Sequence, residues 1–196
     1  MKSIKTALLL ILAGLLFAGC SSSENIEETF PMSMEIEEFS AVNQDGEAVT
    51  LNELKGRITI ADFIFTSCDT VCLPMTANMA HLQKKLKEAN LEEDVKLISF
   101  SIDPENDTPE VLTEYSQRYE ADLAHWDFLT GYTQEEIELF ANRSFNTPAA
   151  KVEGSNQFVH GTSFYLISEN GTVLKQYEGV SDPPFDEMID DIKKLN

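Results

Sequence analysis

Residues 57–79 read "RITIADFIFTSCDTVCLPMTANM" and contain two cysteines at the point where an apolar run gives way to a helical pattern. The first nine of these residues are mostly apolar, β-branched or aromatic, as expected for a strand covered on both faces. Beyond the cysteines, apolar side chains recur at helical spacing as far as about Asn90. Cys68 and Cys72 therefore stand between a buried strand and the start of a helix.

Similar patterns predict the rest of the domain. Further strands are expected at 94–103, 125–131, 163–168 and 172–179, further helices from 109, at 133–145 and at 183–196, and a turn at 43–46 between two short strands. This order indicates a thioredoxin-like (peroxiredoxin-like) α/β domain, with helices flanking the sheet and an added N-terminal β-hairpin. In such sheets chemistry collects where strands end and helix N-termini point, which is where the cysteine pair lies.

The N-terminus carries an export pattern. The chain of 196 residues opens "MKSIKTALLLILAGLLFAGC", in which two lysines precede a short apolar stretch and a small-residue site. Because the stretch is short and no charged stop follows it, a secretory signal is favoured over a membrane span. Residues 17–20 resemble a bacterial lipobox, whose cysteine is diacylated and becomes the new N-terminus. An ordinary signal peptide or an uncleaved anchor is the alternative.

The chain is accordingly divided into a lipoprotein signal peptide (1–19), an acidic tether (20–33) and one folded domain (34–196). Two acyl chains on Cys20 would hold the domain stably at the outer face of the cytoplasmic membrane. Loss of the signal, with its two lysines, takes the formal net charge from −20 to −22. A body this acidic excludes nucleic acid and anionic lipid headgroups as partners.

With Cys20 used by the lipid, Cys68 and Cys72 are the only thiols left. A disulfide that closes so short a loop contributes only about 2 kcal/mol, against about 5 for a loop of 100 residues, so a structural crosslink is a poor explanation. A helix N-terminus lowers thiol pKa and supplies the thiolate that attacks disulfides and binds metals. Both sulfurs also lie on one face of a first helical turn. A redox pair and a metal site both fit.

A third ligand would distinguish a metal site from a plain dithiol, and the chain has three histidines. His81 falls on the opposite face of the helix from Cys72. His125 is expected to pack against other side chains or to face solvent. His160 stands just before the strand at 163–168, in the loop that a thioredoxin-like sheet brings beside the cysteines. Two thiolates and one imidazole suit copper, as Cu(I) or Cu(II), with zinc as the alternative metal.

Three motifs, "ADFIFTSCDTVCLPMT", "LISFSIDPENDTPEVL" and "VHGTSFYLIS", together resemble the SCO/SenC family of copper proteins. The resemblance runs from about Phe39 to the C-terminal helix. It implies a thioredoxin-like fold, membrane anchoring, and copper ligation by Cys68, Cys72 and His160. It also implies a role in assembling the binuclear copper centre in the copper-bearing subunit of cytochrome c oxidase, as copper donor, thiol reductant or both. A protein that donates copper, or a thiol–disulfide partner, would then be a further partner.

Two details of the motifs bear on the site. The family often has proline after each motif cysteine, whereas Asp69 and Leu73 stand there in this chain, which leaves the ligands intact but bears on the shape of the loop. Asp103 ends a predicted strand and is a candidate to orient a ligand or a partner. Turn formation with Pro104 is the alternative explanation.

Two other functions remain open. A metal-independent thiol–disulfide oxidoreductase would use Cys68 and Cys72 alone and has no evident need of His160. A peroxidase of the peroxiredoxin type would account for the threonine and cysteine of "FTSC", with Arg143 as a remote candidate for that family's arginine. The proline that usually precedes this threonine is missing. Whether the protein is an enzyme depends on which of the three functions holds.

Overall fold

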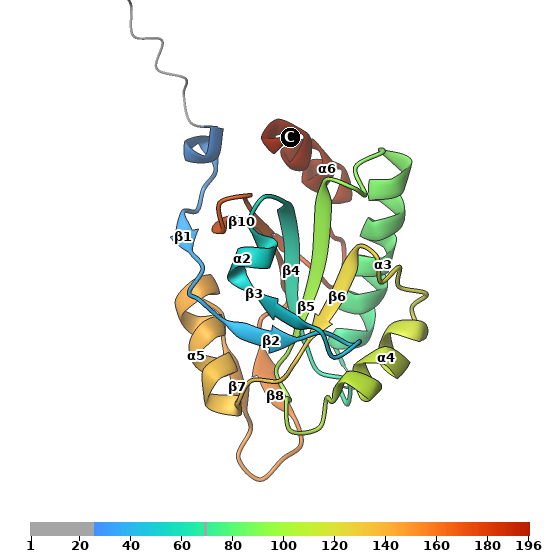
Figure 1. The fold of residues 1–196 in the computed structure, drawn as a ribbon, viewed down its shortest axis with the longest axis vertical. Helices are drawn as coiled ribbons and strands as arrows, with labels where there is room; N and C mark the ends of the chain where they lie inside the picture. Colours follow the sequence, from blue (N-terminus) through green and yellow to red (C-terminus); the bar gives the residue numbers. More distant parts are fainter. Residues whose placement is uncertain (1–25, 69) are drawn as a thin grey trace, which may run out of the picture.

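A six-stranded mixed sheet runs through the middle of the protein (Figure 1). The computed structural model describes residues 26–68 and 70–196. In order across the sheet, the strands are β1 (Met34–Glu35), β10 (Thr172–Glu178), β9 (Ser163–Ile167), β4 (Ile58–Ile64), β5 (Val95–Ser101) and β6 (Trp126–Leu129). β4, β5 and β6 are parallel, while β9, β10 and β1 pair antiparallel. The mixed sheet and its element order match the predicted thioredoxin-like architecture.

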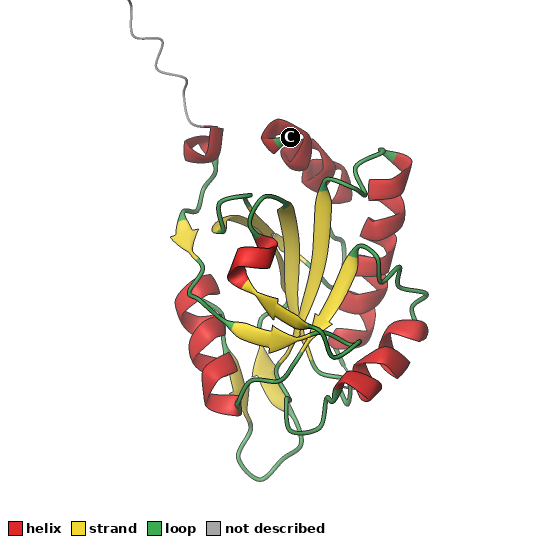
Figure 2. Cartoon of the chain, in the orientation of Figure 1, coloured by secondary structure: helices red, strands yellow, loops and turns green. Residues whose placement is uncertain are grey.

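Helices flank this sheet on both faces (Figure 2). The helices are α2 (Leu51–Leu54), α3 (Cys72–Glu88), α4 (Pro109–Gln117), α5 (Gln134–Phe145) and α6 (Phe185–Leu195), with a short 3-10 helix, η2 (Ile26–Thr29). α3 contacts β5 and α6, and α4 contacts β6, whereas α5 lies across the sheet from them and contacts β1 (Figure 1). Thr108 caps α4 with its side-chain oxygen and Pro109 follows at the first helical position, as predicted.

Two hairpins accompany the main sheet. β2 (Ser40–Val42) and β3 (Ala48–Thr50) form the predicted N-terminal hairpin, whose turn is closed by the Asn43 side chain accepting the backbone N–H groups of Asp45 and Glu47. A second hairpin, β7 (Ala149–Lys151) and β8 (Phe158–His160), was not predicted. It extends beyond the main sheet at one end of the molecule (Figure 1). His160 therefore ends a strand, where we had expected a loop.

The structure describes the chain from residue 26, within the expected tether. Ile26–Thr29 forms η2, Phe30 packs against the core, and the Met32 N–H donates to the Leu174 carbonyl at 2.9 Å. Contacts with the folded body thus begin upstream of residue 34. The expected signal peptide (1–19) and Cys20 lie outside the described residues, and the division of the chain stays a prediction. No helix in the described part of the chain is long and apolar enough to cross a membrane.

The central strand β4 is buried along its whole length and includes one carboxyl group, Asp62. Phe63 packs against Phe145 of α5, so the alternation of a strand turns Asp62 toward the opposite face, where α3 lies. Neither carboxyl oxygen of Asp62 has a hydrogen-bond partner among the described residues. Burial raises the pKa of Asp62 to about 7.

This buried carboxyl group makes stability depend on pH. The folded-state pKa of Asp62 lies above its ordinary value of 3.8, so the folded protein holds the proton more tightly than the unfolded chain does. The resulting stabilisation is complete below pH 3.8 and is lost as the pH rises through about 7. We expect the unfolding free energy of Asp62→Asn, relative to wild type, to rise by up to ~4 kcal/mol between pH 4 and pH 9. Denaturant titrations of the two reduced proteins measure this difference, and a difference that stays constant with pH would contradict the assignment.

Candidate metal centre

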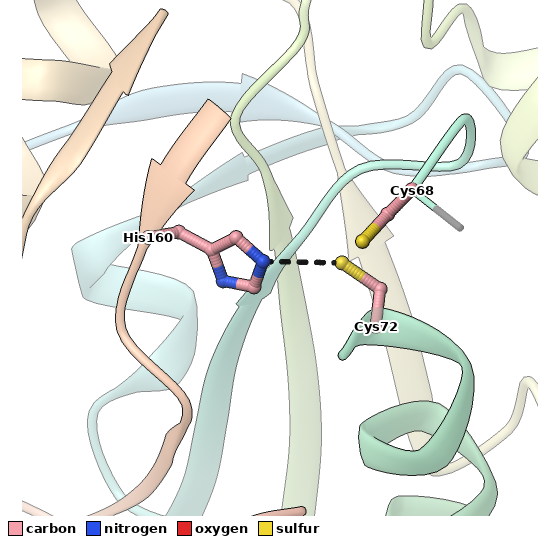
Figure 3. A group of neighbouring side chains, drawn as sticks. All are labelled: Cys68, Cys72 and His160. Atoms are coloured by element: carbon pink, nitrogen blue, oxygen red, sulfur yellow. Dashed lines mark hydrogen bonds between the residues drawn. The ribbon is translucent and has the colours of Figure 1, made fainter. Parts of the chain in front are cut away.

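Cys68, Cys72 and His160 converge at the end of the main sheet where β4 stops and α3 begins (Figure 3). One potential ligand atom from each residue lies within 4.8 Å of the other two. The shortest recorded approach is 3.2 Å, between Cys72 Sγ and His160 Nε2. The structure thus brings together the residues that the sequence predicted as ligands.

The two cysteines are held differently. Cys68 lies in the loop between β4 and α3, where its N–H donates to the Phe65 carbonyl at 3.3 Å and closes a turn. Cys72 is the first residue of α3 and is fully buried, whereas Cys68 is 5% exposed. The Cys72 carbonyl accepts the Thr76 hydroxyl at 2.9 Å, and that hydroxyl oxygen in turn lies 2.7 Å from Tyr115 Oη. The helix therefore fixes Cys72, while Cys68 depends on its loop.

His160 presents one defined nitrogen to the cysteines. Its Nδ1 lies 2.7 Å from the Gly161 carbonyl oxygen, which can only accept, so Nδ1 carries the proton and Nε2 has a free lone pair. Burial lowers the pKa of His160, with a partial offset from the Gly161 carbonyl, so the imidazole is neutral at pH 7. A Cβ atom on Gly161 would collide with the Thr147 side chain, so glycine lets the residue after His160 pack against Thr147. The imidazole packs edge-on against Phe65.

The two thiols differ in acidity. Burial opposes ionisation of Cys68, but hydrogen bonds with Cys72 and Thr70 outweigh it and bring its pKa below the ordinary value. Burial raises the pKa of Cys72 well above its usual range, and the hydrogen bond that its thiol donates to Cys68, with the charges of Cys68 and Asp62, raises it further. The lowering expected at a helix N-terminus does not hold for Cys72, the thiol that opens α3, because burial outweighs it; the pKa of Cys68 is lowered by hydrogen bonds in the loop instead. Cys68 ionises first.

This donor set suits a soft or borderline metal ion. Thiolates and a neutral imidazole favour copper, and a structural zinc site would normally add a fourth protein ligand. The same two sulfurs can instead form a disulfide, which removes both as thiolate ligands. Metal binding and oxidation of the pair therefore exclude each other.

The other residues considered in the sequence have different partners. Asp103 is buried, and its carboxylate accepts both hydrogen bonds of the Asn106 side-chain amide, at 2.9 and 3.0 Å. A role for Asp103 in orienting a ligand stays a prediction. Asp69 lies outside the described residues, and Leu73 is exposed in the first turn of α3. The remaining candidates lie against other side chains: His81 against Phe185, His125 beside Glu93 and Arg143 beside Glu37.

Sequence reasoning missed two buried carboxyl groups near the site. Asp107 accepts the N–H of Thr66 at 3.2 Å, its hydroxyl, and the hydroxyl of Ser101 at 2.6 Å. Its sequence context, Asp-Thr-Pro, indicates only a helix start. Asp62 was also missed, although a single carboxyl group within an apolar strand can be recognised in the sequence as an unusual buried polar residue.

Comparison with known proteins identifies relatives over most of the chain. Residues 28–196 match the model of the SCO1/SenC family. The SCO1 protein homolog of Bacillus subtilis (strain 168) is 48% identical over 184 residues, which cover 94% of each chain. The family match thus includes nearly all of the described residues and all three residues of the candidate site.

Solved structures agree in fold. A SCO1/SenC family lipoprotein from Bacillus anthracis str. Ames superposes with a TM-score of 0.79 at 47% identity, covering 83% of this chain and 95% of that one. BsSco, described as a member of the Sco family of cytochrome c oxidase assembly proteins with a disulfide switch, gives 0.78 at 51% identity, covering 84% and 95%. ScoI of Arabidopsis thaliana, solved with copper bound, gives 0.66 at 31% identity, covering 81% and 96%.

These matches confirm the thioredoxin-like fold and the resemblance seen in the three motifs. They also show that relatives of this chain have been solved with copper bound, and that Cys68, Cys72 and His160 lie as possible copper ligands here. With a family model that spans nearly all of its folded residues and a relative that shares almost half of its sequence, the chain belongs to the SCO1/SenC family.

Proposed function

We propose that the protein binds one copper ion through Cys68, Cys72 and His160 and serves in assembly of the copper centre of cytochrome c oxidase. The observation that carries the proposal is the position of His160 Nε2, deprotonated and 3.2 Å from Cys72 Sγ. A dithiol reductant has no need of an imidazole held in this way. The copper-bound Arabidopsis relative and the described role of the BsSco family support copper as the cargo.

The acid–base properties of the three residues suit reversible binding. Cys68 has a lowered pKa and supplies a thiolate readily, while Cys72 gives up its proton when a cation takes its place. His160 needs no proton loss, because its Nε2 is already free. Three protein ligands leave a coordination position open, through which ligands of the copper-bearing oxidase subunit, or of a copper donor, would enter during exchange.

A lipid on Cys20 would place this chemistry at the outer face of the cytoplasmic membrane. The proposal rests on the apolar export segment and on the site "FAGC" at residues 17–20. The Bacillus anthracis relative, which is described as a lipoprotein, supports it. A membrane-held chaperone would remain close to an oxidase that is itself embedded in the bilayer.

A thiol–disulfide role is a second candidate, favoured by the difference between the two thiols. The Cys68 thiolate, nearer the surface, would attack a partner disulfide and form a mixed disulfide, releasing one partner thiolate. Cys72 would then attack the Cys68 sulfur, which forms the Cys68–Cys72 disulfide and releases the second partner thiolate. Both roles start from the reduced sulfurs, and the disulfide that the reductant role produces removes them as copper ligands.

Replacing His160 separates these two roles. We expect His160→Ala to weaken copper binding to the reduced protein by more than about 100-fold. Loss of a residue that only supports a metal ligand typically weakens binding by about 10–100-fold, and loss of a ligand itself should cost more. The variant should keep both thiols and still form the Cys68–Cys72 disulfide. Competition with a copper chelator measures the affinity, and thiol counting measures the disulfide. His81→Ala is the matched control and should bind copper as wild type does.

The same variants can be tested in a host that lacks its own copy of the gene. There, His160→Ala should fail to restore cytochrome oxidase, as should Cys68→Ala and Cys72→Ala. Full restoration by His160→Ala beside failure of both cysteine variants would reject the copper role and favour the reductant.

The two thiols should react at different rates. In the reduced, metal-free protein at pH 7, we expect iodoacetamide to modify Cys68 at least about ten times faster than Cys72, because only Cys68 has a lowered pKa and Cys72 has no exposed surface. Mass spectrometry of peptides after timed quenching gives both rates. In Cys68→Ser, Cys72 should stay slow; equal rates in the wild type would contradict the assigned acidities.

The lipid on Cys20 is directly testable. Wild-type protein should fractionate with membranes and carry a diacylated N-terminal cysteine in mass spectra, whereas Cys20→Ser should lack the lipid. A wild-type N-terminus without lipid, in protein recovered from the soluble fraction, would reject the anchor.

A further inference from the structure

One fully buried carboxyl group collects three hydrogen bonds beside the metal centre. Asp107, just before α4, accepts the Thr66 N–H at 3.2 Å, the Thr66 hydroxyl at 2.5 Å and the Ser101 hydroxyl at 2.6 Å. Thr66 follows Phe65 in the turn that ends at Cys68, while Ser101 is the last residue of β5. The carboxyl group thus joins the cysteine loop to the neighbouring strand.

Asp107 is also the polar attachment of the loop outside the site itself. Apart from the contact of Cys68 with Cys72, the hydrogen bonds by which residues 66–68 and 70 reach another strand, helix or loop all run from Thr66 to Asp107. Cys72 and His160, by contrast, are held within α3 and β8. Among the three proposed ligands, Cys68 therefore has the position that depends most on a single contact.

We propose that Asp107 is a positioning residue of the metal centre, which clamps Thr66 and so keeps Cys68 Sγ within reach of Cys72 and His160. The inference rests on the proposed function, because it takes these three residues to be the metal ligands. It assigns a purpose to the segment "SIDPENDTP", most of which the proposed function leaves unexplained.

The clamp is itself firmly held. The Asp103 carbonyl accepts the N–H groups of Asn106 and Asp107 at 3.0 and 2.9 Å, which closes the turn that presents the carboxyl group. Ser101 is fixed as well, since its hydroxyl oxygen accepts the Asp103 N–H at 3.1 Å and its carbonyl accepts the Tyr132 hydroxyl at 2.7 Å. Asp107 therefore meets Thr66 from a rigid base.

Asp107 could affect the metal centre through its negative charge or through its hydrogen bonds to Thr66 and Ser101. Replacing the carboxylate with an amide distinguishes these two effects. In Asp107→Asn, the amide oxygen can accept the Thr66 N–H and the Ser101 hydroxyl. The amide NH2 can donate to the Thr66 hydroxyl oxygen once that hydroxyl has rotated. Asparagine thus keeps the clamp without the charge, whereas alanine removes both.

The experiment compares copper affinities of the reduced proteins in competition with a chelator. We expect Asp107→Ala to bind copper about 10–100-fold more weakly than wild type, and Asp107→Asn to bind within a fewfold of wild type. Thr66→Val, which loses the hydroxyl but keeps its N–H, should fall between them. Thr66→Ser, which keeps both donors, should match wild type. If Asp107→Ala does not fold, the comparison of Thr66→Val with Thr66→Ser still tests the clamp.

A control variant accounts for the general cost of removing a buried carboxylate. Asp127 is 8% exposed and pairs with Lys96 at 2.9 Å, near the starts of β6 and β5 and so away from the cysteines. Asp127→Ala should lose stability but keep wild-type copper affinity. Equal loss of affinity in Asp127→Ala and Asp107→Ala would overturn the proposal.

A metal-free measurement keeps this inference separate from the copper proposal. The equilibrium of the Cys68–Cys72 disulfide with glutathione should shift toward the dithiol in Asp107→Ala and Thr66→Val, but stay in place in Asp107→Asn and Thr66→Ser. If wild type binds no copper, the proposed function fails while this equilibrium still tests the clamp. Asparagine as disruptive as alanine, or alanine as good as wild type, would overturn the inference.

Discussion

The parallel pairing of β4 with β5 is the contact on which the position of every site residue depends. It runs in register from Ile58 with Val95 to Ile64 with Ser101, and the Ile102 N–H extends it to the Ile64 carbonyl at 2.8 Å. Because both strands end together, the loop after β4 lies beside the turn after β5. The chain then has one short path from β4 into α3, so Cys72 opens that helix at the edge of the sheet. On the other side of β4, β9 follows directly after the segment that bears His160.

The ionisable side chains at this edge of the sheet are buried to different degrees, and burial changes their acidity. A carboxyl group without a hydrogen-bond partner in an apolar core costs free energy, and Asp62 bears that cost beneath α3. Its charge acts on Cys72 and, with burial, overrides the effect of the helix N-terminus on that thiol. Burial acts on Cys68 too, but hydrogen bonds with Cys72 and Thr70 outweigh it there and lower the pKa of that thiol. Two chemically identical side chains four residues apart thereby acquire different proton affinities.

Much of the fold was predictable because local patterns agree with the tertiary structure. The long strands at 58–64 and 95–101, and the helices α3, α5 and α6, follow apolar periodicity. The hairpin β7–β8 lacks that signal, since its tip is rich in glycine, serine and asparagine and it has little apolar alternation. His160 was assigned correctly to the neighbourhood of the cysteines only because the fold was recognised first. Asp107 escaped notice because its partner Thr66 lies 41 residues away in sequence, and such a pairing exists only in three dimensions.

The attachment of η2 and Met32 to the folded body determines how a lipidated form of the protein would stand on a bilayer. An extended chain from Cys20 to Ile26, the first residue of η2, reaches only ~20 Å. η2 lies at the opposite end of the main sheet from the β7–β8 hairpin (Figure 1). A body held this closely by one end turns its other end away from the headgroups, so the cysteines and His160 would face outward. Such a geometry favours exchange with a domain that projects from the membrane rather than with groups buried in it.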